Sequence, residues 1–542
     1  MVSRLIHFRS KTITSAAFLL ATTALLSRVL GLFRDGILAG KFGAGDELDI
    51  YFAAFRIPDL LYNIVIAGAI SSAFIPVFIA LYTKNKKEAW AATSNFLNIA
   101  VASLFILGIL LVLTAPFLVK FVAPGFDEAK TAATVEATRI MFLSPLFLGM
   151  SAILGGILNS FKRFFVYALA PLFYNAGIIF GAVVLADDMG VLGLALGVVI
   201  GSFLHFIIQV PSVFLSGFYW QRVFDLGDKH FRKIFFLMVP RAFGLVVFQL
   251  NLWVITAIAS VLSSGSIAIF NFANHLQFLP IGIIGYSFAT AAMPSFAKSV
   301  SQERIKLFGD QLANTVRMVL FFVVPTSVLI FVLRAHIVRL IFGSGEFGWD
   351  DTRLTAAVLG IFTFGIFAHS LIPLLSKAFY AMQNTKTPVI INSIGFFINI
   401  ALSAFFVFVL FGDPKVSGFI SEFLDMGGID NIALLGLPLA FSLAGIINFA
   451  ILFYALKKSA GVFQDASLYF AGLKMFFASI AAGLTTYGTL FLVEPLFYTE
   501  TVFGLLLQAG FASIAGVIAY IAIMLLFRSQ ELISIWRKIR RF

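Results

Sequence analysis

Apolar residues fill long stretches of this chain, and short polar connections separate them. A run of about 20 mainly apolar residues is enough for a helix to cross a membrane, and fourteen stretches meet this condition. They cover residues 16–40, 56–82, 91–119, 134–160, 165–186, 191–217, 233–262, 267–297, 312–335, 355–382, 387–411, 433–456, 468–493 and 503–527. The pattern predicts an all-α polytopic membrane protein with fourteen transmembrane helices.

Charges in the connections alternate in sign along the chain. Every second connection and both tails are basic and hold 24 of the 38 lysines and arginines, whereas the connections between them are mostly acidic. Basic residues collect on the cytoplasmic side of membrane proteins, so we expect a multi-pass protein of a bacterial cytoplasmic membrane with both termini in the cytoplasm. The first apolar stretch is long and contains arginines, which predicts a retained helix rather than a cleaved signal peptide.

Two segments outside these stretches have helical potential of their own. The tail SQELISIWRKIRRF is basic and amphipathic, which is typical of a helix on an anionic inner leaflet, although a simple stop-transfer flank would read the same way. The connection 411–432 is the longest on the acidic side, and we expect a short surface helix in it.

Composition supports a membrane protein and removes several kinds of chemistry. Of 542 residues, 60% are hydrophobic and 12% are charged, with a mean hydropathy of +1.01, whereas soluble domains carry about 25% charged residues. The chain has no cysteine, which excludes disulfides, thiolate metal sites and cysteine nucleophiles. The net charge of +12 lies in the connections, so we expect no nucleic-acid partner. Without a phosphate-binding loop or clustered histidines, we expect no cofactor and no metal.

The two halves of the sequence resemble each other. ISSAFIPVF and TAAMPSF each close a stretch on a proline, and each half later has a proline followed four residues on by an asparagine. The matched residues are Pro76 with Pro294, Pro171 with Pro388, Asn175 with Asn392, and Arg56 with His275. We therefore expect an N-terminal lobe over 1–218 and a C-terminal lobe over 219–458, six helices each around a central cavity, followed by two helices and a basic tail over 459–542.

The first apolar stretch contains a group of charges. Arg28, Arg34 and Asp35 lie inside SAAFLLATTALLSRVLGLFRDGILAG, and each charge at that depth costs a few kcal/mol. Arginine presents a planar fork of N–H donors that suits phosphate or carboxylate, so the group indicates an anionic substrate. The alternative is an ion pair that joins this helix to its neighbours. Because Arg34 and Asp35 are adjacent, we expect them to point to different sides of the helix and not to face one partner.

At SRVLGLFRDGILAGKFGAGDELDIYFAAFRIPDLL the sequence resembles the MurJ (MviN) family of lipid II flippases, within the multidrug/oligosaccharidyl-lipid/polysaccharide exporter superfamily. AGAISSAFIPVF, GGILNSFKRFFVYALAP and AFYAMQNTKTP extend this resemblance over essentially the whole chain. It implies a two-lobe protein with a cationic central cavity that carries an undecaprenyl-diphosphate-linked peptidoglycan precursor from the inner to the outer leaflet. Ser27, Arg28, Arg34 and Asp35 match the family's first-helix site residues, and Asp49 matches its acidic residue at the start of the second helix.

The chain departs from the family pattern at several positions. Tyr62 and Asn63 stand where the family usually has arginines, and His275 replaces another arginine. The candidate substrate-binding residues are Arg34, Arg28, Ser27, Asp35, Asp49, Arg56 and His275. We expect a non-enzymatic flippase that binds lipid II or a similar polyprenyl-diphosphate glycolipid and contacts membrane lipids. An exporter of another polyprenyl-diphosphate glycan and, less favoured, a membrane glycosyltransferase are the alternatives.

Overall fold

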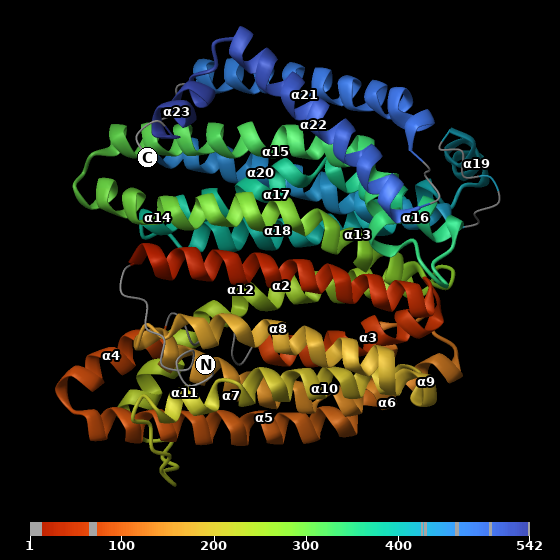
Figure 1. Ribbon diagram of the computed structural model, residues 1–542. Coiled ribbons are helices and arrows are strands. Elements are labelled where there is room, and N and C mark those ends of the chain that lie inside the picture. The colour runs from red at the N-terminus through yellow and green to blue at the C-terminus, as the bar shows by residue number, and fades with distance from the viewer. Residues whose placement is uncertain are drawn as a thin grey trace. The chain divides into compact units, whose positions relative to one another are not determined.

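The computed structural model describes residues 13–63, 73–423, 427, 431–460, 465–497 and 501–539. Every regular element in these ranges is a helix, which confirms the all-α prediction (Figure 1). Several residues behind the charge alternation lie outside the described part: Arg4, Arg9, Lys11, Asp425, Asp430, Glu500, Arg540 and Arg541. The chain divides into two compact units, residues 1–268 with 344–347 and residues 269–343 with 348–542.

The first unit is built from long helices and a few short ones. They are α2 (Ile13–Phe42), α3 (Asp46–Tyr62), α4 (Ile75–Lys84), α5 (Lys86–Val122), α6 (Glu128–Met141), α7 (Leu143–Ser160), α8 (Phe164–Phe180), the π-helical segment η3 (Gly181–Leu185), α9 (Ala186–Met189), α10 (Val191–Ile207), α11 (Val210–Phe214) and α12 (Lys229–Ser260). Side chains cap the first turn of several of these helices, because the first N–H groups of a helix lack intrahelical partners. Asn85 accepts from the first turn of α5, Asp127 from α6 and Asp228 from α12.

Glycines let α8 and α10 approach very closely (Figure 1). A Cβ atom on Gly177 would lie 2.3 Å from the Cα atom of Gly201, and one on Gly181 would lie 2.5 Å from the Cα atom of Gly197. Small residues at such crossings allow close helix packing in membranes. The pair α8–α10 thus forms a rigid support, and α8 also packs along α2.

The second unit contains the remaining helices. They are α13 (Ser266–Pro280), whose first residues belong to the first unit, the π-helical segment η4 (Ile281–Gly285), α14 (Tyr286–Ser301), α15 (Ile305–Phe342), α16 (Trp349–Thr363), α17 (Ile366–Ala381), α18 (Lys386–Ala404), the π-helical segment η5 (Phe405–Leu410), α19 (Pro414–Phe423), the 3₁₀ turn η6 (Ile432–Leu435), α20 (Gly436–Ala460), α21 (Asp465–Val493), the 3₁₀ turn η7 (Glu494–Leu496), α22 (Val502–Leu526) and α23 (Gln530–Ile539). The helices α21 and α22 run side by side along α15 (Figure 1).

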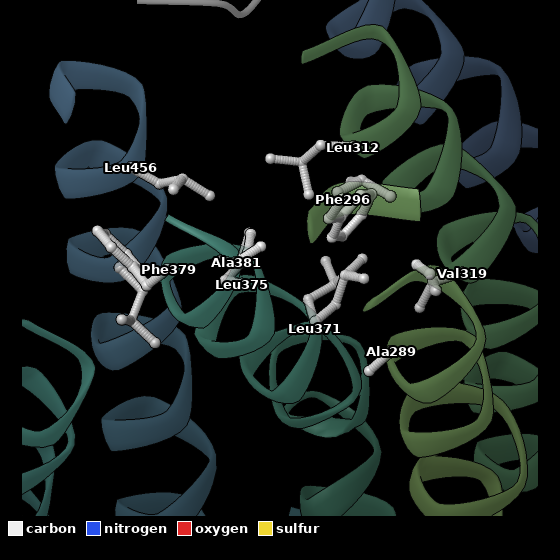
Figure 2. Packing of buried hydrophobic residues seen from close by; sticks show 14 of the residues in the cluster. Ala289, Phe296, Leu312, Val319, Leu371, Leu375, Phe379, Ala381 and Leu456 are labelled. Atoms are coloured by element: carbon white, nitrogen blue, oxygen red, sulfur yellow. The ribbon is translucent and has the colours of Figure 1, made fainter. Parts of the chain in front are cut away.

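The main core of this unit lies where α14, α15, α17 and α20 meet. Figure 2 shows Phe296, Leu312, Leu371, Leu375 and Leu456 converging there, and all five are fully buried. Each apolar side chain removed from contact with lipid or water here adds dispersion contacts to its neighbours. The core therefore fixes the inner helices of the unit, against which the outer helices pack.

Each of the fourteen predicted stretches overlaps one or more helices, but the count of fourteen spans is not confirmed. Within the described ranges, ten continuous helices are long and apolar enough to cross a membrane, or eleven if α16 and α17, bent by 46°, form one span. The chain is thus a multi-pass membrane protein. The expected helix in the connection 411–432 is confirmed as α19, and the tail forms the helix α23; the contact of α23 with the membrane stays a prediction.

The aligned parts of the two halves share local structure within their own units. Asn175 on α8 and Asn392 on α18 both bond to a side chain of another helix, Arg34 and Asn448 respectively. A π-helical segment follows directly after both α8 and α18. These similarities support the sequence repeat, while the division at residues 218 and 458 stays a prediction.

Candidate functional site

Arg34 lies on α2 and is fixed by two neighbours. Its Nε and one terminal nitrogen donate to Oδ1 of Asp35, at 3.0 and 2.6 Å, and the other terminal nitrogen donates to Oδ1 of Asn175 at 3.0 Å. The Arg34 side chain is 18% exposed and that of Asp35 only 2%. A guanidinium has five N–H donors, so two of them are not used by these bonds.

The expectation that Arg34 and Asp35 point to different sides of the helix and cannot both face one partner did not include their pairing with each other. Their Cα–Cβ bonds do diverge around the helix, but the arginine stem is long enough to bring its guanidinium back onto the neighbouring carboxylate. Pairing also offsets the large cost of burying Asp35 alone. The pair still leaves Arg34 partly exposed.

Asn175 is a site residue that the sequence indicated only through the repeat. Its amide nitrogen donates to the carbonyl oxygen of Pro171, 2.9 Å away and one turn earlier on α8, which turns the amide oxygen toward Arg34. The signal in the sequence was a polar residue inside an otherwise apolar stretch. Ser27 and Arg28 lie nearly two turns before Arg34 on α2, and both are partly exposed.

Asp49 is buried and bound on both oxygens. Its Oδ2 accepts from the backbone N–H of Gly265 and its Oδ1 from that of Ala268, each at 2.8 Å, and the side chain is 3% exposed. Carboxylates at the start of a helix satisfy its free N–H groups and interact well with its dipole. Asp49 thus holds the beginning of α13, and its predicted contact with substrate stays a prediction.

Arg56 is buried inside the first unit rather than extended to a membrane surface. Its Nε donates to Oγ1 of Thr256 at 2.8 Å, and the indole of Trp253 donates to the Arg56 carbonyl oxygen at 3.0 Å. Both partners lie on α12, so Arg56 connects α3 to α12. His275 lies on α13 in the second unit and is partly buried; the expectation that it faces Arg56 stays a prediction.

The described side chains contain no group of three or more histidines, aspartates or glutamates that could hold a metal ion. Around Arg34 the structure shows a different set of groups, and the role of these groups in binding an anion stays a prediction. The set combines a positioned guanidinium, a neutralising carboxylate and an amide that orients the guanidinium. Such an arrangement favours a planar, bidentate contact with a phosphate group.

Comparisons with known proteins identify the family of this chain. The family model "Lipid II flippase MurJ" matches residues 38–511. A Vibrio cholerae protein named probable lipid II flippase MurJ is 31% identical over 434 residues, which cover 77% of this chain and 82% of that protein. The solved structure of a lipid II flippase MurJ in an inward closed conformation shares 26% identity with a TM-score of 0.74, covering 94% of this chain and 99% of that one.

A more distant structure shows the same fold. An inward-facing multidrug resistance MATE transporter of the MOP superfamily has a TM-score of 0.63 at 13% identity and covers 80% of this chain and 96% of its own. At that identity the likeness concerns the fold alone. The family model covers most of the sequence, and its match includes Asp49, Arg56 and His275. This chain belongs to the lipid II flippase MurJ family.

Proposed function

We propose that this chain moves lipid II, the undecaprenyl-diphosphate-linked peptidoglycan precursor, from the inner to the outer leaflet of a bacterial cytoplasmic membrane. The observation that carries the proposal is Arg34, a partly exposed guanidinium in an apolar helix whose orientation two other side chains fix. The family match supplies the substrate class. The protein acts as a transporter and breaks no covalent bond.

Arg34 is the main diphosphate contact in this proposal. Asp35 and Asn175 use three of its N–H groups, and the remaining donors bind phosphoryl oxygens. Arg28 adds a second positive charge on the same helix, and the Ser27 hydroxyl adds a neutral donor. Asp35 restricts the motion of the guanidinium, so less side-chain entropy is lost when the substrate binds.

The remaining candidates are Asp49 and Arg56, which hold helices in position, and His275. Asp49 holds the start of α13 through Gly265 and Ala268, and His275 lies seven residues beyond Ala268 on the same helix. Arg56 connects α3 to α12. We propose that His275 contacts the diphosphate in place of the family's arginine, and that Asp49 and Arg56 keep the helices in place as the cavity opens alternately to each side.

Reconstituted vesicles test this function directly. The purified protein is inserted into vesicles that contain fluorescently labelled lipid II, and transfer between leaflets is followed by quenching from outside. We expect transfer by the unaltered chain and a loss of at least tenfold in Arg34→Ala, because a charge-assisted contact contributes about 1.5–3 kcal/mol. Arg139→Ala is the matched control, since Arg139 is an exposed arginine that donates only to the Val112 carbonyl oxygen.

Full activity in Arg34→Ala would reduce Arg34 to a structural partner of Asp35 and would end the site assignment. Transfer of a labelled polyprenyl-diphosphate glycan without the pentapeptide, at the same rate as lipid II, would broaden the substrate to that lipid class. Growth of a flippase-depleted bacterium that expresses this chain gives an independent test in the cell.

A further inference from the structure

In the second unit, a cavity of about 440 Å³ opens between the ends of α15, α21 and α22. None of the candidate substrate-binding residues lines this cavity. His336 and Arg339 lie in the last turns of α15, Tyr487 near the end of α21, Glu494 in the turn after it, and Gln508 in the second turn of α22. Trp349, the first residue of α16, also lines the cavity. Its size is within the usual range for a small-molecule site, about 300–1,000 Å³.

The polar groups of this cavity have unused binding capacity. The Arg339 guanidinium lies over the Trp349 ring, 5.2 Å from its centroid, and forms no ion pair within the described part of the chain. His336 Nε2 is 3.2 Å from Oε1 of Gln508, whose amide nitrogen donates to the Leu490 carbonyl oxygen. Nδ1 of the same imidazole is buried and has no hydrogen-bond partner. Buried polar atoms without a partner are uncommon, so this nitrogen indicates a missing ligand atom.

The position of the cavity at helix ends indicates the level where a bilayer changes from hydrocarbon to headgroups. All three helices are apolar enough to cross a membrane, and the cavity is at their ends. Tryptophan and tyrosine concentrate at this level in membrane proteins. Large apolar side chains near the end of α21 are exposed, with Phe491, which lines the cavity, at 58% and Leu492 at 77% exposure. Acyl chains can therefore lie along α21 while the headgroup enters the cavity.

We propose that this cavity binds the zwitterionic headgroup of a phospholipid from the surrounding bilayer. The phosphodiester lies against Arg339, and the ammonium donates to Nδ1 of His336, the imidazole nitrogen that has no partner. The ammonium lies near Glu494 and the faces of Tyr487 and Trp349, since aromatic rings attract cations. Because the cavity presents one acid, Glu494, and one guanidinium, Arg339, a headgroup with both charges fits better than a polyprenyl diphosphate. The proposal does not rest on lipid II transport.

Native mass spectrometry of the full chain released from detergent tests this site. The protein is titrated with phosphatidylethanolamine or with phosphatidylglycerol of the same acyl chains, and the bound lipids are counted. We expect a phosphatidylethanolamine complex that is weakened about tenfold or more in Arg339→Ala. Arg334→Ala is the matched control, because Arg334 lies five residues earlier on α15, over the Phe331 ring at 4.8 Å, and does not line the cavity.

Two further variants separate the charges. Glu494→Gln removes the negative charge, so we expect the preference for phosphatidylethanolamine over phosphatidylglycerol to fall. Arg339→Lys keeps the positive charge and reports whether a folded chain retains partial binding. Glycerophosphoethanolamine, the same headgroup without acyl chains, should not compete at equal concentration.

Three results would overturn the proposal. Equal lipid binding by Arg339→Ala and the unaltered chain would remove the cavity from consideration. Equal competition by glycerophosphoethanolamine or inorganic phosphate would make it a site for soluble phosphate compounds. Displacement of the phospholipid by a polyprenyl diphosphate, with the same dependence on Arg339, would make it part of the transport route. Lipid II transfer in vesicles is measured in parallel, so a failure of either proposal is seen separately.

Discussion

At the scale of single residues, the site depends on the shape of Arg34 as well as on its charge. Its Nε and both terminal nitrogens each have a partner, Asp35 or Asn175. A lysine at this position has three donors on one nitrogen and cannot bond to Asp35 and Asn175 in the same geometry while facing a phosphate. The planar fork thus explains why an arginine is used here.

Arg34→Lys is therefore expected to reduce lipid II transfer almost as strongly as Arg34→Ala, although it keeps the positive charge. The measurement is the initial rate of leaflet transfer at equal protein density, with binding of labelled lipid II measured separately. A variant that transfers lipid II at the unaltered rate would show that charge alone is sufficient at residue 34.

The sequence predicted the identity of these residues better than their contacts. Arg34 and Asp35 stood out because charges in an apolar stretch are costly, but their direct pairing depends on how a flexible side chain folds back. Asn175 was visible only as a polar residue in a repeat. The partners of the Asp49 carboxylate are backbone N–H groups of residues 265 and 268. Because every residue except proline has such a group, the sequence does not reveal these partners.

At the scale of elements, three segments of the first unit meet through glycines. We call this the glycine junction: residues 40–45, from the last turn of α2 to the start of α3, together with Gly265 before α13 and residues 344–347. The backbone N–H of Glu346 donates to the Gly40 carbonyl oxygen at 2.8 Å. Gly265 and Gly345 have positive φ angles of 84° and 58°, and a Cβ atom on Gly265 would lie 1.9 Å from the Ala44 carbonyl oxygen. Only glycine fits both the conformation and the space.

Gly265→Ala is expected to lower the free energy of unfolding by about 1–3 kcal/mol, because the added methyl group meets backbone atoms that cannot move aside alone. The measurement is the unfolding of the purified protein at increasing concentrations of a denaturing detergent. Gly217→Ala is the control, since Gly217 also has a positive φ angle, 89°, but has open space around it. Equal losses in both variants would mean that backbone strain alone, and not the close approach, limits residue 265.

The elements themselves were largely predictable, whereas their bends were not. Apolar length placed a helix at each expected stretch, but the stretch 355–382 is two helices, α16 and α17, bent by 46°. At the break, a Cβ atom on Gly365 would lie 2.9 Å from the Cα atom of Ser442. The bend accompanies close packing against a helix far along the chain, which local periodicity cannot show.

At the scale of the whole molecule, the expected orientation rests on the alternation of charge. Single cysteines test it well, because the chain has none of its own. We expect a cysteine at Ser417, on α19, to react with a membrane-impermeant thiol reagent in intact cells, and one at Lys87 to react only after lysis. We chose Lys87 for the cysteine and not Asn85 in the same connection, because the Asn85 side chain caps α5 and its loss would disturb the helix. The opposite labelling pattern would invert the topology.

The glycine junction also has a chemical consequence. Nearby, the Asp46 carboxylate forms an ion pair with Lys130 at 2.7 Å and accepts a hydrogen bond from the Ser264 hydroxyl. Burial raises the pKa of its carboxyl, but the hydrogen bonds from Lys130 and Ser264 outweigh this and leave the pKa below its ordinary value. The ion pair therefore stabilises the folded chain fully at a pH above the ordinary carboxyl pKa. This stabilisation is lost as the pH falls through the lowered pKa of Asp46. The glycines and the hydrogen bond from the Glu346 N–H to the Gly40 carbonyl oxygen carry no net charge, so acid and salt leave them unchanged. Acid or salt should therefore weaken the ion pair between Asp46 and Lys130 first, while the hydrogen bond between Glu346 and Gly40 persists.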